Sequence, residues 1–165
     1  MNRAEFEKEV LLIQEPLRRF LYNLCSGDAA LGDDIAQEAL IKAYLNLSSF
    51  SGKAKFSTWL FRIAYNCFCD NKRASKKYAS AELNENIVKD NESADSKFKN
   101  QELYMAMSKL NEKERTTVLL FYMEDRSLKE IAVITGMPEN TVKSHLSRAR
   151  GNLSNHLNQI GYERR

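Results

Sequence analysis

The sequence predicts an all-α protein built from two small helical domains joined by a flexible linker, with a helix-turn-helix in the C-terminal domain. Apolar residues recur with a period of about 3.6 in both halves of the chain, and no segment shows the alternation of a β-strand. A polar segment, residues 76–98, separates the two halves. The 165 residues suffice for one compact domain or two small ones.

Residues 1–75 are predicted to form the first domain. A helix that Pro16 breaks or kinks comes first, followed by a turn at 26–28 and helices over about 29–47 and 57–75. The residues expected to face the core from the first helix are Phe6, Val10, Ile13, Leu17, Phe20, Leu21 and Leu24.

Residues 76–98 are rich in Lys, Asn, Glu, Ser and Asp, and such a segment cannot bury enough apolar surface to offset its ordering entropy. The sequence therefore predicts a flexible linker, followed by a second domain over 99–165. Asn111, three residues before Glu114, is a candidate helix cap. The apolar residues expected inside this domain are Leu103, Met107, Leu110, Val118, Leu119, Leu120, Phe121 and Met123.

Residues 127–150 have the pattern of two helices joined by a tight turn. Ser127 and Glu130 have the spacing of a capping box, Gly136 suits a helix end, and Pro138 suits a helix start. In the second helix one face is apolar, with Val142, Leu146, Ala149 and Leu153. Asn140, Lys143, Ser144, Ser147 and Arg148 point elsewhere, as in a helix that enters a DNA major groove. Such helix pairs also occur in proteins that never bind DNA, where the charged face is merely solvated.

The net charge of +3 conceals two basic blocks. Residues 51–80 carry seven Lys and Arg against one Asp, and residues 127–165 carry six against three Glu, so these are the places where a polyanion would bind. Residues 1–50 carry five basic and eight acidic residues, which suits a basic protein partner. No run approaches the roughly 20 apolar residues of a membrane span, and the N-terminus lacks a signal-peptide core. We therefore expect a cytoplasmic protein.

The cysteines and histidines predict neither a disulfide framework nor a metal site. The number of cysteines, three, is odd, and Cys67 and Cys69 point to nearly opposite sides of a helix. We expect no cofactor.

The first basic block interleaves aromatic and cationic side chains, the combination that binds unpaired bases and phosphates. Phe50, in a Ser/Gly loop, is the aromatic residue that packing explains least, whereas Phe56, Trp59 and Ile63 are expected in the core. The cations near the loop include Lys53 and Lys55. A polar stripe along the following helix comprises Arg62, Asn66, Asp70 and Arg73. This stripe is either a ladder of ion pairs within the helix or a surface for bases and phosphates.

A further stripe lies on the predicted 29–47 helix, where it is acidic at one end and apolar at the other. Its members, Asp34, Gln37, Glu38, Ile41 and Leu45, share one face. This face suits docking against a basic partner helix, although amphipathic helices of this kind are common.

The order of these stripes resembles that of the extracytoplasmic-function (ECF, group 4) sigma factors, which are sigma-70 family subunits of bacterial RNA polymerase. The resemblance covers about residues 5–75 and 100–158. Its motifs are D-x-x-Q-E at Asp34, Gln37 and Glu38, F-S-T-W-L-F-R-I-A-Y-N from Phe56 to Asn66, and T-V-K-S-H-L-S-R-A-R from Thr141 to Arg150. The chain departs from the family at Leu40, where Phe is usual, and at His145, where Arg is frequent.

The resemblance implies that residues 1–75 are sigma region 2 and that 99–165 are region 4. Region 2 would bind the clamp helices of the polymerase β′ subunit through the face of Asp34 to Leu45, and would recognise and melt the promoter −10 element. The loop of Phe50 would capture a flipped base, beside Asn66. Region 4 would dock on the β flap and read the −35 element. Its implied DNA-binding residues are Asn140, Thr141, Lys143, Ser144, His145, Ser147 and Arg148.

The expected function is therefore that of a sigma factor, which directs core polymerase to promoters and is not an enzyme. Family members are commonly held inactive by an anti-sigma factor, so such a partner is also expected. Two other functions fit the sequence less well. A polymerase-independent regulator is disfavoured because the N-terminal half lacks the strand–helix alternation of a receiver domain. A nuclease is disfavoured because no clustered metal-binding carboxylates, and no nucleophile paired with a base, occur in the sequence.

Overall fold

The computed structural model describes residues 1–81 and 97–159, except for the side chains of residues 79–81 and 97–100. The described backbone is helical wherever it is regular, and it contains no strand. The chain divides into two compact units, each considered separately below. The predicted all-α fold is thus confirmed.

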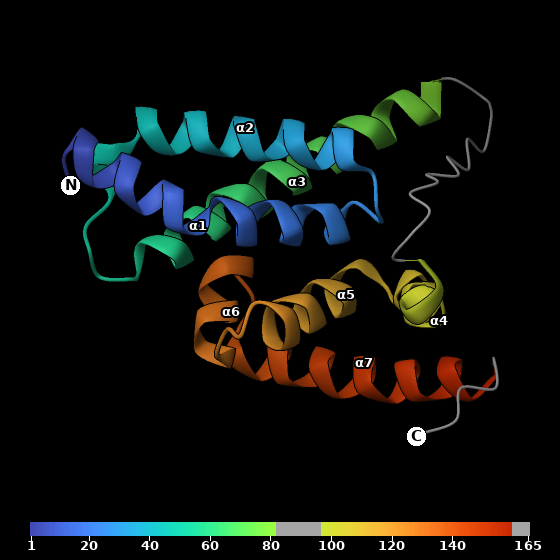
Figure 1. The fold of residues 1–165 in the computed structure, drawn as a ribbon. Coiled ribbons are helices and arrows are strands. Elements are labelled where there is room, and N and C mark those ends of the chain that lie inside the picture. Colours follow the sequence, from blue (N-terminus) through green and yellow to red (C-terminus); the bar gives the residue numbers. More distant parts are fainter. Residues whose placement is uncertain (82–96, 160–165) are drawn as a thin grey trace. The chain divides into compact units, whose positions relative to one another are not determined.

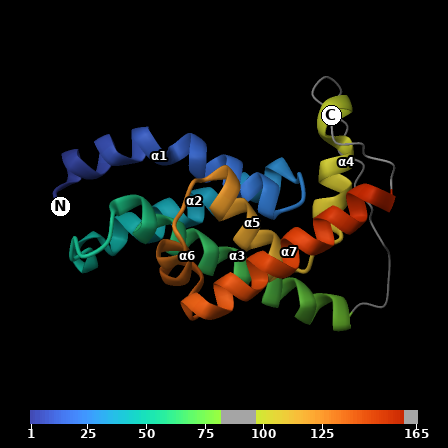
Figure 2. The same ribbon diagram turned by 90° about the horizontal axis from the view of Figure 1, so that it is seen from below.

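The first unit contains α1 (Arg3–Leu24), α2 (Ala29–Leu45), the short 3₁₀ helix η1 (Leu47–Ser49) and α3 (Phe56–Ala81). The three long helices pack pairwise against one another, as Figures 1 and 2 show. Their shared core is made of large side chains with almost no exposed surface: Leu17, Phe20, Leu21, Leu24, Ile35, Leu60, Phe61 and Phe68.

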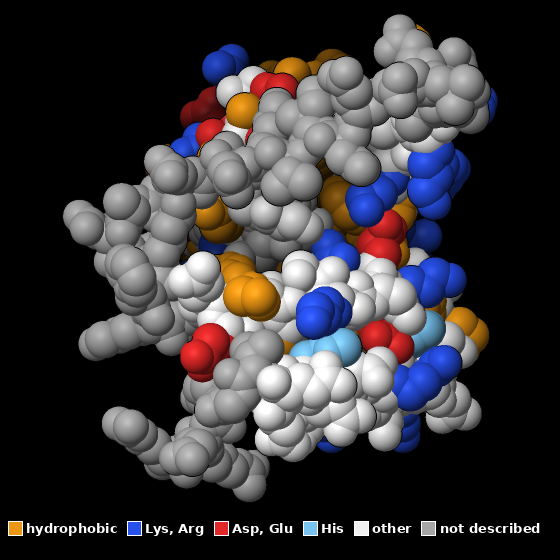
Figure 3. Space-filling view, turned by 90° about the vertical axis from the view of Figure 1, so that its right-hand side faces the viewer, with side chains coloured by type: hydrophobic (Ala, Val, Ile, Leu, Met, Phe, Trp, Pro, Cys, Tyr) orange, Lys and Arg blue, Asp and Glu red, His pale blue; other side chains and the backbone are white. Residues whose placement is uncertain are grey.

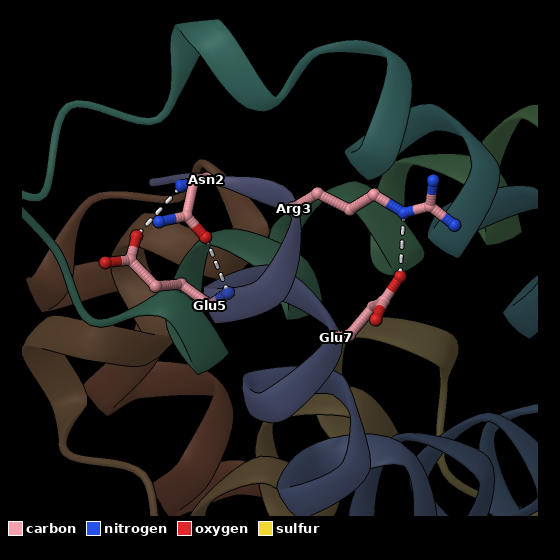
Figure 4. A network of polar contacts seen from close by, with 4 residues as sticks. All are labelled: Asn2, Arg3, Glu5 and Glu7. Atoms are coloured by element: carbon pink, nitrogen blue, oxygen red, sulfur yellow. Dashed lines mark hydrogen bonds and ion pairs between the residues drawn. The ribbon is translucent and has the colours of Figure 1, made fainter.

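The start of α1 is fixed by local polar contacts (Figure 4). The backbone N–H of Glu5 donates to Asn2 Oδ1 over 2.9 Å, and the backbone N–H of Asn2 donates to Glu5 Oε2 over 2.8 Å, which completes a capping box. Arg3 Nε, in the same first turn, donates to Glu7 Oε1 over 2.8 Å. The Asn2 side chain thereby satisfies a backbone N–H that the first helical turn leaves without a partner.

Pro16 was expected to break or kink the first helix, but α1 continues from Arg3 to Leu24 through it, so a break there is wrong. Proline removes one backbone hydrogen bond and costs a helix about 3 kcal/mol. Leu17 and Leu21 follow it and are completely buried, so packing against the other helices outweighs that cost.

The turn between α1 and α2 forms where it was predicted. Ser26 and Gly27 have positive φ angles of 55° and 86°, and the Asp28 side chain caps α2 by accepting from the backbone N–H of Leu31 over 3.1 Å. Gly32, in the first turn of α2, allows a close approach of the two helices. A Cβ at this position would lie 3.2 Å from the backbone nitrogen of Tyr22.

The third helix is longer than predicted, because α3 continues through residues 76–81 instead of ending near Ser75. This stretch, Lys-Lys-Tyr-Ala-Ser-Ala, contains neither glycine nor proline to end a helix. At the other end of the predicted linker, α4 already begins at Lys97. The remainder, 82–96, lies outside the described residues, and the exact domain boundaries stay a prediction.

The second unit contains α4 (Lys97–Ser108), α5 (Glu112–Val118), the π-helical segment η2 (Leu119–Met123), α6 (Leu128–Thr135) and α7 (Glu139–Gln159). Helices α4 and α5 each pack against α7. The core comprises Leu110, Val118, Leu146 and Ala149, with Met107, Phe121, Leu128 and Leu153 packed partly buried against it.

Two predicted core residues of this unit are wrong. Leu103 is 45% exposed and Met123 is 43% exposed. Leu103 lies one turn before Ala106 and Met107, which are buried and partly buried. Met123 ends η2, whose wider π-helical turn shifts the side-chain direction relative to the α-helical register assumed from the sequence.

The predicted caps and the turn are confirmed. The Asn111 side chain accepts from the backbone N–H of Glu114 over 2.9 Å. Ser127 and Glu130 form the reciprocal capping box, with distances of 3.0 and 3.1 Å. Gly136 has a φ of 74°, and α7 begins directly after Pro138. These features produce the predicted helix-turn-helix of α6 and α7.

Candidate functional site

One face of α2 displays acidic and apolar side chains together. Asp34, Gln37 and Glu38 are exposed, and they are followed on the same face by Ile41 and Leu45, which are 60% and 73% exposed. The α1 and α3 contacts use the opposite face, with Ile35, Ala36, Ala39 and Ala43 buried. The structure thus gathers all five predicted polymerase-binding residues on a surface that the rest of the unit leaves uncovered. We call this surface the α2 face.

Phe50 lies in the loop between η1 and α3, where it is half-buried. Its ring centroid lies 5.1 Å from that of Trp59 and 5.8 Å from that of Phe56. Phe56 in turn contacts Phe6 of α1, edge to face, with centroids 5.7 Å apart. Phe50 therefore has a packing role that its loop position did not indicate, because it fixes the loop against the first turn of α3.

A pocket of about 290 Å³ lies between the end of α2 and α3, beside this loop. We call it the Asn66 pocket; it is lined by Lys42, Asn46, Ser49, Trp59, Ile63, Asn66 and Cys67. Phe56 is buried as predicted, but Trp59 and Ile63 remain partly exposed because they form walls of this pocket. Of the predicted −10 residues, only Asn66 lines it.

Sequence reasoning missed the contribution of α2 and η1 to this pocket. Lys42 Nζ lies 2.7 Å from Glu38 Oε1, and this hydrogen bond is the main reason why the pKa of Lys42 is raised. The Cys67 thiol lies beside the same amine, and burial, followed by the charge of Glu38, raises its pKa. No periodicity within one helix could have indicated this group, since its members come from separate elements.

The polar stripe of α3 is exposed along its whole length, at Arg62, Asn66, Asp70 and Arg73. Asp70 Oδ1 lies 3.7 Å from Arg73 Nη1. The alternative prediction for this stripe, ion pairs within the helix, is therefore met at this end of it. Lys53 and Lys55, in the loop before α3, are exposed as well. The predicted −10 residues thus occupy one loop and one helix face of the same unit.

In α7 the apolar and polar faces separate as predicted. Val142, Leu146 and Ala149 are buried, whereas the exposed residues are Asn140, Lys143, Ser144, Ser147 and Arg148. The Ser144 hydroxyl donates to the carbonyl of Asn140 over 3.1 Å, which uses its single O–H donor and leaves both lone pairs of its oxygen able to accept hydrogen bonds. A helix held by its back and polar in front has the form required for groove insertion.

Thr141 and His145 are only partly exposed, unlike the other predicted −35 residues. The pKa of His145 is lowered, first by burial and then by the charges of Arg148 and Lys113, against which Glu114 acts in the opposite direction. Figure 3 shows pale blue histidine atoms among blue lysine and arginine and red carboxylate side chains on the face turned to the viewer. Burial therefore favours the neutral form of His145, which flanks the exposed face.

Two further contacts anchor α7 to α5 and η2. Arg150 Nε donates to the hydroxyl of Tyr122, and the guanidinium lies 5.7 Å from the ring centroid of Phe121. Asn152 Nδ2 donates to the buried carboxylate of Glu114 over 3.3 Å. Arg150 thus holds the helix in place, although it belongs to the same basic motif as Arg148.

Within residues 1–81 and 97–159, no group of three or more His, Cys, Asp or Glu side chains is arranged to hold a metal ion. All three cysteines are free thiols. Over the same ranges, no helix has both the length and the apolar character needed to cross a membrane.

Comparison with known proteins identifies the family to which the chain belongs. Residues 12–78 match Sigma-70 region 2, and residues 100–153 match Sigma-70, region 4. The chain is 36% identical over 157 residues to the ECF RNA polymerase sigma factor SigW of Bacillus subtilis, which covers 85% of this chain and 84% of SigW. The chain belongs to the ECF sigma factors of the sigma-70 family. It is thus a transcription initiation factor that directs RNA polymerase to promoters.

Other relatives agree. The ECF RNA polymerase sigma-E factor of Escherichia coli is 32% identical over 149 residues, which cover 82% of this chain and 76% of that protein. Among solved structures, the sigma factor RpoE of Bartonella quintana, in complex with the anti-sigma factor NepR, superimposes with a TM-score of 0.78. The superposition covers 93% of this chain and 97% of the RpoE chain, and the two sequences are 28% identical.

Proposed function

We propose that this sigma factor binds core RNA polymerase through the α2 face and the second unit, and holds a promoter at two separate elements. The α2 face would bind the clamp helices of the β′ subunit. The exposure of Ile41 and Leu45 beside Asp34 and Glu38 is the observation that carries this proposal. A basic partner helix that also carries apolar side chains would form ion pairs with the carboxylates of the α2 face and would cover its apolar side chains at the same time. The second unit would dock on the β flap.

The exposed side of α7 would enter the major groove of the −35 element. Lys143 and Arg148 supply charge for phosphates and base edges, and Asn140, Ser144 and Ser147 supply neutral hydrogen-bonding groups. Thr141 and His145, being half-buried, would act at the edge of this contact. His145 would contribute less positive charge than an unperturbed histidine, because its pKa is lowered.

At the −10 element, region 2 would favour the melted strand over the duplex. The cations Lys53, Lys55, Arg62 and Arg73 would follow phosphates, and Asp70 lies on the same stripe. A base that leaves the stack would enter the Asn66 pocket, where Trp59 offers an aromatic wall. Binding there would offset an unstacking cost of a few kcal/mol. Binding of this kind shifts the equilibrium from duplex to melted DNA and makes or breaks no covalent bond, so we propose that the protein is not an enzyme.

We also propose that an anti-sigma factor regulates this protein. The Bartonella quintana RpoE structure contains the anti-sigma factor NepR, and 93% of the present chain superimposes on that sigma factor. The same exposed surfaces that would bind polymerase are available for such an inhibitor. A subunit that acts on promoters would work in the cytoplasm.

Run-off transcription tests the proposed function. Purified chain and core polymerase are combined on promoters mapped after overexpression of the chain. We expect transcripts from defined start points that require both components. A second reaction contains the chain with Ile41→Ser and Leu45→Ser, whose folding is checked by circular dichroism. Failure of the wild-type chain to start transcripts at any defined position would reject the proposal.

A further inference from the structure

Lys42 joins the two functional surfaces of the first unit. Its ammonium group lies 2.7 Å from Glu38 Oε1, and Glu38 belongs to the α2 face. The same side chain lines the Asn66 pocket. Among the described residues that line this pocket, Lys42 is the one that carries a charge. One ion pair therefore connects a residue proposed to bind polymerase with a pocket proposed to bind an unstacked nucleotide.

An ordinary explanation exists for this pair, since Glu and Lys four residues apart stabilise many helices weakly. The Arg3–Glu7 pair of α1 has this spacing and a similar distance, 2.8 Å, and neither residue lines the Asn66 pocket. What distinguishes Lys42 is its position. Each nucleotide that enters the Asn66 pocket brings a phosphate with it, and its neutral walls provide no other cation to meet that phosphate.

We propose that Lys42 is a further nucleic-acid-binding residue, which contacts the phosphate of the nucleotide in the Asn66 pocket, and that Glu38 competes with this phosphate for it. The proposal rests on the proposed function, because it assigns a nucleotide to the pocket. In the free protein Glu38 neutralises Lys42. When a basic polymerase helix binds Glu38, the ammonium group is released toward the pocket.

This competition couples the two binding events. A ligand that binds Glu38 strengthens the binding of the strand, and by linkage the strand strengthens the binding of that ligand by the same factor. Both side chains of the pair are about half-exposed, 45% and 47%, so water screens their attraction. The factor is therefore modest, about two- to fivefold. Sequence readout would not depend on Lys42, because a phosphate carries no base identity.

The coupling can be measured on the full chain without polymerase. Fluorescence anisotropy would follow binding of a labelled, mixed-sequence single-stranded DNA of 12 nucleotides at several salt concentrations. The variants are Glu38→Gln, Lys42→Gln and the double substitution. Glu7→Gln is the matched control, because it breaks an ion pair of the same spacing and removes the same charge.

We expect Glu38→Gln to tighten binding about two- to fivefold. It should also steepen the plot of log affinity against log salt concentration by about 0.7, the value for one additional phosphate contact to a single strand. Neither change should occur when Lys42 is already Gln. A merely structural ion pair would not alter the salt slope in this way.

Three results would overturn the proposal. The first is an equal gain from Glu38→Gln in the Lys42→Gln background, and the second is an equal gain from Glu7→Gln. The third is no detectable strand binding by Glu38→Gln. If run-off transcription by the wild-type chain still succeeds, such a result rejects the role of Lys42 alone, whereas failed transcription rejects the proposed function itself.

Discussion

The ring of Phe50 lies against the ring of Trp59, with centroids 5.1 Å apart and planes inclined by 46°. Trp59 is also a wall of the Asn66 pocket. The loop that carries Phe50 is therefore fixed to the same side chain that would stack on an unstacked base. Any movement of Phe50 toward DNA would change one wall of that pocket.

Replacing Phe50 with Ala should impair promoter opening more than −35 binding. The substitution removes contacts with Trp59 and Phe56, so the first unit should also lose about 1–2 kcal/mol of stability. Permanganate footprinting would report the open complex, and footprinting of the −35 region would report duplex binding. Phe50→Leu keeps most of the volume and serves as the control. Equal losses at both elements would contradict a role at the −10 element.

Replacing Asp34 and Glu38 with Ala should weaken association with core polymerase at least tenfold, because both carboxylates would be desolvated against a basic helix. Pull-down with tagged core enzyme would measure this. A double variant of Glu9 and Glu15 removes the same charge from α1, another helix of the first unit, and serves as the control. Normal capture of the core by the Asp34 and Glu38 double variant would reject the docking surface.

The sequence was sufficient to predict features that depend on neighbouring residues. The caps at Asn111 and Ser127 and the turn at Gly136 were predicted correctly, because each is determined by groups a few residues apart. The continuation of α1 through Pro16 was not predicted, because it depends on the burial of this helix against other helices.

The candidate site shows the same division. The members of the α2 face follow helical spacing and were found from sequence. The Asn66 pocket was not found from the sequence, because Lys42 and Ser49 approach Asn66 only when α2 and η1 pack beside α3. Likewise, the family resemblance placed His145 among the −35 residues, and the sequence gives no sign that Lys113 and Glu114 of α5 influence its pKa.

Gly32→Ala should destabilise the first unit by about 1–3 kcal/mol, because the new Cβ would lie 3.2 Å from the Tyr22 backbone nitrogen inside a packed helix pair. Gly151 in α7 is the matched control, since a Cβ there meets nothing within 4 Å. Gly151→Ala should stabilise the second unit by about 0.5–1 kcal/mol through helix propensity. Urea denaturation would measure both, and a stabilised Gly32→Ala would show that the helices can separate without cost.

His145 should make the second unit less stable at acidic pH. Its pKa is lowered from 6.5 in the folded protein, so below pH 6.5 the unfolded chain binds more protons than the folded one. The stabilising contribution of neutral His145 is thus complete above pH 6.5 and is lost as the pH falls through the folded pKa. Urea unfolding between pH 7.5 and 5 would show a smaller decline for His145→Gln than for wild type. His156→Gln, the other histidine of α7, is the control, and an unchanged decline in His145→Gln would contradict the assignment.

Arg148 and Arg150 should differ in function although they are two residues apart. Arg148 is on the exposed face of α7, so Arg148→Ala should reduce affinity for the −35 element. If Arg148 contacts one phosphate, the slope of log affinity against log salt concentration should fall by about 0.9. If it reads a base, the preference for that base should weaken by about 1–3 kcal/mol. Arg150 binds Tyr122 and lies over Phe121. Arg150→Ala should therefore cost about 0.5–1 kcal/mol of stability and leave the salt slope unchanged. Titrations of −35 duplexes at several salt concentrations, with thermal unfolding of both variants, would separate the two roles. A lower slope for Arg150→Ala would place it on the DNA instead.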